Sequence, residues 1–229
     1  LPPRTMPIGA ALGASGRSML VLTSRALAAL DLVTGAVVWR RPVTAPTSIV
    51  ADGGTARVLT GRGTLIVDED AQRLERLAPS LKAGLLATVD DDRSAVVHAA
   101  RVTTFVTRSG AVETRLTHKR GDPVLAAGGD EVGLVVVTDR RWLARFVGRP
   151  LEAAEAVRLD ANATALAVSP ATARVAVAMG REVIVLEADL RERARVRLEH
   201  PVSAIAFADG RLLVCGGQGG EVSLVETDR

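Results

Sequence analysis

Apolar and polar residues alternate in short runs along most of the chain, and glycine, proline, aspartate and serine separate the runs. The clearest stretch is residues 163–201, where four β-prone runs are divided by Ser-Pro, Gly and Asp. Short runs with a period of two residues and turn residues at both ends are typical of antiparallel strands. This stretch therefore predicts a four-stranded antiparallel meander.

The same unit recurs along the chain. Its predicted first strands are 36 to 40 residues apart and begin near Ile8, Thr47, Ala83, Pro123, Ala163 and Val202. Such a period with four strands per unit is expected for the blades of a β-propeller, in which neighbouring blades cover each other's faces. We predict an all-β fold with a single β-propeller domain over residues 1–229. Its six blades are expected at about 7–42, 46–79, 82–118, 123–160, 163–199, and 202–229 plus 1–6.

The sixth predicted unit lacks its outermost strand. Propellers commonly close when the opposite terminus supplies such a strand, so we expect residues 1–6 to complete the last blade. Pro2 and Pro3 cannot donate backbone hydrogen bonds, but an edge strand tolerates proline. The alternative is that the sequence is a piece of a longer protein, and that the last strand or further blades lie outside it.

One blade carries a recognisable pattern of an aspartate, a Thr-Gly turn and a tryptophan. Its residues are Asp31, Thr34, Gly35 and Trp39. The pattern resembles the quinoprotein-type (PQQ-like) propeller repeat, and it covers about a dozen residues in one predicted blade.

The last predicted unit resembles a WD40 repeat. His200 opens it, and the Gly-rich hairpin at 216–220 precedes its third strand. Val225 and Glu226 occupy the positions where that family has tryptophan and aspartate. Together the two patterns resemble a divergent propeller of the WD40/quinoprotein-like superfamily, which implies the fold and no particular activity.

Composition agrees with a folded domain. Hydrophobic residues make up 48% of the chain and charged residues 24%, as in globular proteins that bury a core. The net charge of +3 is too small to indicate a nucleic-acid partner. No apolar run approaches the ~18 residues of a transmembrane helix. Cys215 is the single cysteine, so no intrachain disulfide forms, and we expect a cytoplasmic protein. A periplasmic location is the alternative if an export signal precedes Leu1.

Catalytic chemistry finds little support in the sequence. A quinoprotein dehydrogenase needs calcium held by carboxylate and amide oxygens, yet Asn162 is the single asparagine and the predicted inner strands carry alanine and aliphatic residues. His98, His118 and His200 lie in different predicted blades or connections, so they are not expected to share one metal. Cys215 stands in an apolar run, where a small buried residue is expected. We therefore expect no catalytic residues, no metal and no cofactor.

Three surfaces are candidates for binding a partner protein. Arg140 and Arg141 beside Trp142 have the composition of an interface hot spot, although Trp142 could equally pack between blades. A second basic connection contains His118, Lys119 and Arg120.

The third candidate is a row of arginines on a predicted outer strand. Alternation directs Arg193, Arg195 and Arg197 to the face opposite the apolar residues. The alternative role of this row is protection of an edge strand against aggregation.

The sequence thus favours a non-catalytic interaction scaffold, a propeller that presents rim loops to partner proteins in a bacterial multicomponent assembly. The first alternative is an envelope scaffold resembling the PQQ-repeat lipoprotein of outer-membrane assembly, which would need an export signal upstream of Leu1. The others are a sensor propeller associated with an ATPase or protease, and a hydrolase or lyase with its site in the central channel. The partner's identity does not follow from the sequence.

Overall fold

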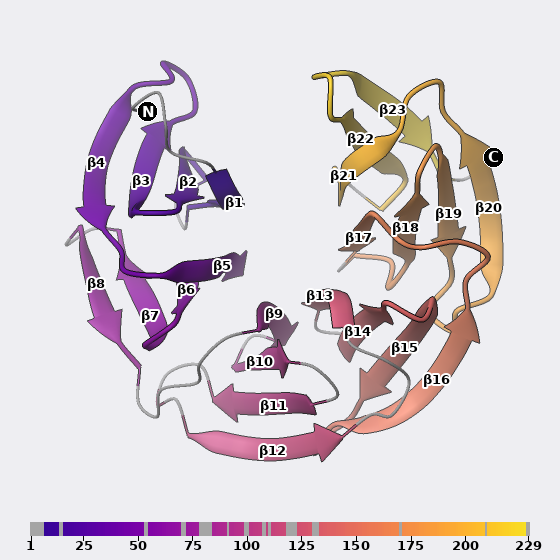
Figure 1. Ribbon diagram of the computed structural model, residues 1–229, viewed down its shortest axis with the longest axis horizontal. Helices are drawn as coiled ribbons and strands as arrows, with labels where there is room; N and C mark the ends of the chain where they lie inside the picture. Colours follow the sequence, from indigo (N-terminus) through magenta and orange to yellow (C-terminus); the bar gives the residue numbers. More distant parts are fainter. Residues whose placement is uncertain are drawn as a thin grey trace. The chain divides into compact units, whose positions relative to one another are not determined.

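The computed structural model is built from antiparallel β-strands that follow one another in sequence (Figure 1). It describes residues 7–13, 16–52, 55–69, 72–77, 84–90, 92–98, 101–106, 109, 111–117, 123–129, 133–169, 171–208 and 210–227. The chain forms two compact units, one of residues 1–98 and 102–115 and one of residues 99–101 and 116–229.

The first unit contains two whole sheets and most of a third. The first sheet joins β1 (Pro7–Leu12), β2 (Ser18–Thr23), β3 (Ala26–Asp31) and β4 (Val37–Pro42). The second joins β5 (Pro46–Asp52), β6 (Thr55–Thr60), β7 (Gly63–Asp68) and β8 (Arg73–Arg76). The third joins β9 (Leu85–Asp90), β10 (Arg93–His98), β11 (Arg101–Val106) and β12 (Val112–Thr117).

The second unit contains the remaining sheets. The fourth joins β13 (Pro123–Gly129), β14 (Gly133–Thr138), β15 (Trp142–Val147) and β16 (Glu152–Arg158). The fifth joins β17 (Ala165–Val168), β18 (Val175–Met179), β19 (Glu182–Leu186) and β20 (Glu192–Arg197). The sixth joins β21 (Val202–Phe207), β22 (Leu212–Gly217) and β23 (Val222–Glu226).

These six sheets are the blades of a β-propeller and confirm the predicted all-β fold. Within each sheet the strands lie in chain order, as in a meander. Five blades have four strands, and the sixth has three in the described part of the chain. The strand that residues 1–6 are predicted to add falls outside the described residues.

Strand β18 shows why continuous apolar runs occur in this fold. All five of its residues are buried. Val175, Val177 and Met179 belong to the core shared with the fourth blade, whereas Ala176 and Ala178 belong to the core shared with the sixth. A strand between two neighbouring blades has no polar face, so the usual alternation gives way to an unbroken apolar sequence.

A threonine at the end of the second strand organises the following hairpin in three blades. Thr23 Oγ1 donates to the carbonyl of Ala26 (3.0 Å), and Thr60 Oγ1 donates to that of Gly63 (2.7 Å). In the fourth blade Thr138 Oγ1 accepts from Trp142 N (3.2 Å). These hydroxyls satisfy backbone groups of the turns and fix the start of each third strand.

Candidate interaction surfaces

The hairpin between β14 and β15 carries the predicted pair Arg140 and Arg141. Arg141 has φ 62°, a left-handed conformation that is uncommon for a residue with a Cβ. The fold holds it there, because Arg141 N donates to Thr138 O (3.0 Å) and Leu159 N donates to Arg141 O (2.7 Å). Its guanidinium also donates from Nη1 to Asp160 O (2.8 Å). The turn therefore has one defined shape, with the Arg140 side chain exposed beside it.

Trp142 follows this turn as the first residue of β15. Its side chain is half-buried, and its backbone pairs with Arg158 on β16. A half-buried indole contributes to packing and also presents an edge to the surface.

The arginine row on β20 has the predicted alternation. Ala194 and Val196 are half-buried, whereas Arg193, Arg195 and Arg197 are exposed. The apolar side of β20 joins the core between the fifth and sixth blades through Val196, and Leu198, just after the strand, packs against the same core.

Arg195 lies among three carboxylates. Its Nε and Nη2 donate to the two oxygens of Glu192 (3.0 and 2.7 Å). Its Nη2 also reaches Asp160 Oδ2 (2.9 Å), and its Nη1 reaches Glu182 Oε2 (3.2 Å). The hydrogen bond with Glu192 is the main cause that raises the pKa of Arg195, and its counterpart lowers the pKa of Glu192. We call Asp160, Glu182 and Glu192 the carboxylate nest of Arg195.

Arg193 connects the fifth blade to the sixth. Its Nη1 donates to Glu187 Oε1 (2.7 Å), and its Nε donates to Thr227 O (3.1 Å). Arg174 approaches the other oxygen of Glu187 (3.6 Å) and donates to Gly210 O (3.2 Å). Arg193 therefore has a structural contact in addition to its place in the exposed row.

Asp160 brings two of the predicted sites together. Its backbone carbonyl accepts from Arg141, and its carboxylate accepts from Arg195. Sequence reasoning did not single out Asp160, although Glu199 repeats it at the equivalent position 39 residues later. We call Arg140, Arg141, Trp142, Asp160 and Arg195 the Asp160 surface.

The other predicted residues fall elsewhere. Arg197 lies on the same strand as Arg195 and is exposed. His118, Lys119 and Arg120 are outside the described residues.

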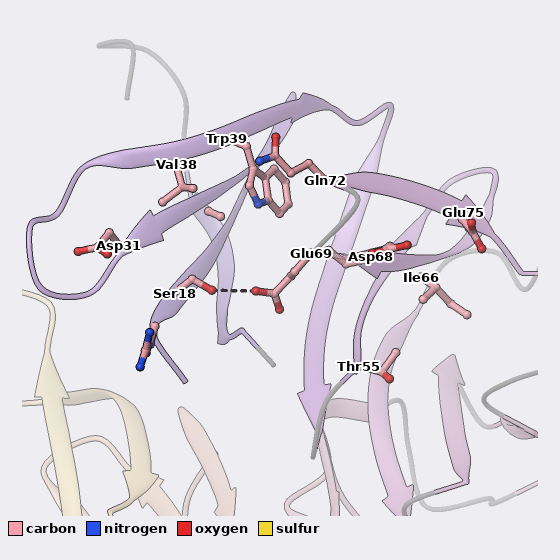
Figure 2. Close-up of a pocket in the computed structure, with 13 residues that line it drawn as sticks. Ser18, Asp31, Val38, Trp39, Thr55, Ile66, Asp68, Glu69, Gln72 and Glu75 are labelled. Atoms are coloured by element: carbon pink, nitrogen blue, oxygen red, sulfur yellow. Dashed lines mark hydrogen bonds between the residues drawn. The ribbon is translucent and has the colours of Figure 1, made fainter. Parts of the chain in front are cut away.

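The first unit has a pocket of about 550 Å³ between its first two blades (Figure 2). Trp39 and four carboxylates line it, those of Asp31, Asp68, Glu69 and Glu75. Ser18 Oγ donates to Glu69 Oε2 (2.8 Å) across the seam between the blades. Arg73 bridges Asp68 and Glu75 at 3.2 and 2.7 Å. The acidic groups of this pocket thus make contacts within the protein, which suits a seam between blades.

The residues of the quinoprotein-like pattern have structural roles here. Asp31 Oδ1 accepts from the backbone nitrogens of Val33 (3.0 Å) and Thr34 (2.7 Å) and from Thr34 Oγ1 (2.9 Å). Gly35 follows with φ 70°. The hydrogen bond from the Thr34 backbone is the main cause that lowers the pKa of Asp31. Trp39 is buried in the core between the first two blades.

Among the described residues no three His, Cys, Asp or Glu side chains are grouped as metal ligands. Cys215 is buried, as its apolar run predicts, and burial raises the pKa of its thiol. The Gly-rich segment at 216–220 forms the end of β22 and the turn before β23, so it is a hairpin, as predicted. None of the described residues forms a helix long and apolar enough to cross a membrane.

Comparisons with known proteins identify the fold. A chain of Kuenenia stuttgartiensis hydrazine synthase superposes with a TM-score of 0.76 at 13% identity, covering 97% of this chain and 84% of that one. The β-propeller domain of Cps50 (Swd1) from Myceliophteria thermophila gives a TM-score of 0.78 at 14% identity, covering 97% and 83%. No protein-family model matches the chain, and no curated protein matches it in sequence.

These likenesses support a propeller over nearly the whole chain. Both identities are low, so the likenesses show the fold alone, and the WD40-like and quinoprotein-like patterns each rest on the sequence. One of the two similar structures is named for an enzyme, so the fold by itself assigns no activity.

Proposed function

We propose that this propeller is a non-catalytic protein-interaction scaffold and that the Asp160 surface meets its partner. The observation that supports the proposal is the double contact of Asp160, which links the Arg140–Trp142 hairpin to the arginine row of β20. Two segments from different blades thereby share one fixed arrangement.

Preorganisation is what makes such a surface suitable for binding. A partner that meets an ordered hairpin does not have to offset the entropy of ordering it. Arginine and tryptophan are also the side chains that most often dominate interface energies. The carboxylate nest reduces the net charge of the surface, so we expect a partner with mixed charges and no nucleic acid.

The scaffold would serve a bacterial multicomponent assembly, with the cytoplasm as its proposed compartment. Rigid blades suit this role because binding residues on short loops keep their positions. The test is to capture partners with the wild-type chain, identify them by mass spectrometry, and reconstitute the complex from purified proteins.

The decisive variants change the hairpin. Arg140→Glu combined with Trp142→Ala should weaken the reconstituted complex at least about tenfold, the typical loss at a hot spot. Arg76→Glu is the matched control, since Arg76 is exposed on the outer strand β8 of another blade. Equal affinity of the hairpin variant and the control would remove the Asp160 surface from the proposal.

A further inference from the structure

The hairpin between β3 and β4 carries an apolar patch on its surface. Four large hydrophobic residues are exposed there, the most exposed being Val33 at 93%. They are half of the large hydrophobic residues that are exposed in the described part of the chain, so apolar exposure is concentrated on the first blade. Apolar residues gathered on a surface are typical of a binding site for another molecule. We call Leu32, Val33, Val37 and Val38 the β3–β4 patch.

The hairpin presents this patch in a defined shape. Asp31 N donates to Ala36 O (2.9 Å), and Gly35 N donates to Asp31 O (2.8 Å). The Asp31 carboxylate also accepts from Thr34 N (2.7 Å). A partner that binds the patch therefore meets a turn that is already ordered, which lowers the entropic cost of binding.

The pocket between the first two blades adjoins the patch. Val38 belongs to the patch and also lines the pocket. Figure 2 shows Asp31 and Val38 on one side of the pocket and Asp68 and Glu75 on the other, with Trp39 between the two sides. Val38 and Glu75 are both exposed, so the pocket opens to solvent next to the patch.

The pocket is acidic, although the whole chain has a net charge of +3. Four carboxylates line it. Two guanidinium groups oppose them, because Arg17 lines the pocket and Arg73 bridges Asp68 and Glu75. The pair of Arg73 with Glu75 is exposed on both sides and is therefore weak, and a carboxylate can accept from a second cation. The pocket thus favours a positively charged group.

Trp39 makes an arginine the best match among such groups. Its side chain is buried, so a ligand reaches the ring from inside the pocket. A guanidinium is planar, stacks on an aromatic ring and donates two parallel hydrogen bonds to a carboxylate, whereas an ammonium acts as a point charge. A volume of about 550 Å³ is within the range of ligand pockets.

We propose that the first blade binds an extended segment of a partner protein in which one arginine stands between apolar residues. The arginine enters the pocket, stacks on Trp39 and binds its carboxylates. The apolar neighbours of this arginine lie on the β3–β4 patch. The charge of the pocket selects the arginine, and the patch selects a polypeptide over a small cation. This site lies within the first unit and does not depend on the Asp160 surface.

The test uses the acetylated and amidated peptide Gly-Val-Leu-Arg-Leu-Val-Gly, labelled with a fluorophore. Its binding to the 229-residue chain is measured by fluorescence anisotropy. We expect saturable binding with a Kd below about 1 mM. The control peptide has citrulline, a neutral group of the same shape, in place of arginine. It should bind at least about tenfold more weakly, because it lacks the charge that the pocket recognises.

Variants of the protein locate the site. Glu75→Lys should weaken the peptide at least about tenfold by placing a cation in the pocket wall. Glu155→Lys is the matched control, since Glu155 is exposed on the outer strand β16 of another blade and the change in net charge is the same. Val38→Ser should weaken binding about fivefold through lost apolar contact, whereas Val222→Ser, at an exposed position of β23, should leave it unchanged.

NMR gives a second readout. The chain has two tryptophans, and the spectrum of Trp142→Phe identifies the indole N–H signal of Trp39. The unlabelled peptide should shift the Trp39 signal and leave that of Trp142 in place.

Any of three results would overturn the proposal. One is no saturable binding of the arginine peptide up to about 1 mM. Another is equal affinity of the arginine and citrulline peptides. The third is equal affinity of Glu75→Lys and Glu155→Lys, or a shift of the Trp142 signal alone, since either would place the peptide elsewhere. The Asp160 surface is tested by partner capture, which these peptide measurements do not involve, so the two proposals fail separately.

Discussion

The third and fifth blades each hold an arginine between carboxylates, but at different depths. Arg93 in β10 is 7% exposed, donates from Nε to Asp90 Oδ2 (2.6 Å), and lies 3.6 Å from Glu113. Arg195 in β20 is 35% exposed and has three carboxylates around it. Among the ion pairs of the described residues, Arg195 thus has more carboxylates around it, and Arg93 is the more buried arginine.

The burial of each ion pair determines how much each arginine contributes to stability. Removing one partner of a buried pair leaves a charge without compensation in a medium of low polarity, which is strongly destabilising. An exposed pair gains little, because water and salt screen it and both side chains lose entropy. We therefore assign Arg93 to stability and the nest of Arg195 to the shape of a surface.

The largest effect should come from Arg93→Ala. It leaves the carboxylate of Asp90 half-buried without its guanidinium, and we expect a loss of about 3 kcal/mol. Urea unfolding followed by tryptophan fluorescence and compared with the wild type measures this loss. Arg73→Ala is the control, because Arg73 is 62% exposed in its ion pairs and should cost less than about 1 kcal/mol. Equal midpoints for the two variants would contradict the importance of depth.

A smaller effect is expected at Asp31, because its carboxylate accepts hydrogen bonds from backbone N–H groups and from the Thr34 hydroxyl. Thr34→Val removes the hydroxyl that donates to Asp31 Oδ1, so the pKa of Asp31 should rise toward its ordinary value. In the wild type the lowered pKa makes Asp31 stabilising above its unfolded pKa, and this contribution is lost as the pH falls through the folded pKa. NMR titration of the Asp31 carboxyl measures the change. Thr117→Val, at an exposed position of β12, should leave the Asp31 pKa where it is.

Arg195→Ala should lower the free energy of unfolding by less than Arg93→Ala does. We expect a loss below about 1 kcal/mol, reduced further by added salt, because the nest is exposed. Urea unfolding followed by tryptophan fluorescence at low and at high salt measures this loss. A loss as large as that of Arg93→Ala, or one that salt does not reduce, would show that the nest supports the core.

Much of the fold could be predicted from the sequence, because each blade repeats local signals. Period-two alternation and glycine turns located the strands, and the spacing of the first strands gave the number of blades. Alternation also predicted which side of β20 exposes its arginines. These features depend on neighbours in sequence, which a single chain displays directly.

Contacts between distant residues could not be predicted in the same way. Nothing local shows that Arg141 and Arg195 meet at Asp160, or that Arg57 is fully buried in β6. The recurrence of Asp160 as Glu199, 39 residues later, can be seen in the sequence, but only the structure shows that Asp160 contacts Arg195. The sequence of a repeat protein thus shows where acidic residues recur, and the structure shows what they hold.

The smallest effect is expected for Arg197→Ala, which serves as the reference for the contribution of the carboxylate nest of Arg195. Arg197→Ala changes a residue of the same type, on the same strand and face as Arg195, and Arg197 pairs in register with Glu182. As an exposed residue at the end of β20, it should change the free energy of unfolding by no more than about 0.5 kcal/mol. The difference in free energy of unfolding between Arg195→Ala and Arg197→Ala, measured by urea unfolding in the same buffer, is then the contribution of the nest. If the two variants are indistinguishable in stability but differ in partner affinity, the nest orders the Asp160 surface without stabilising the blade.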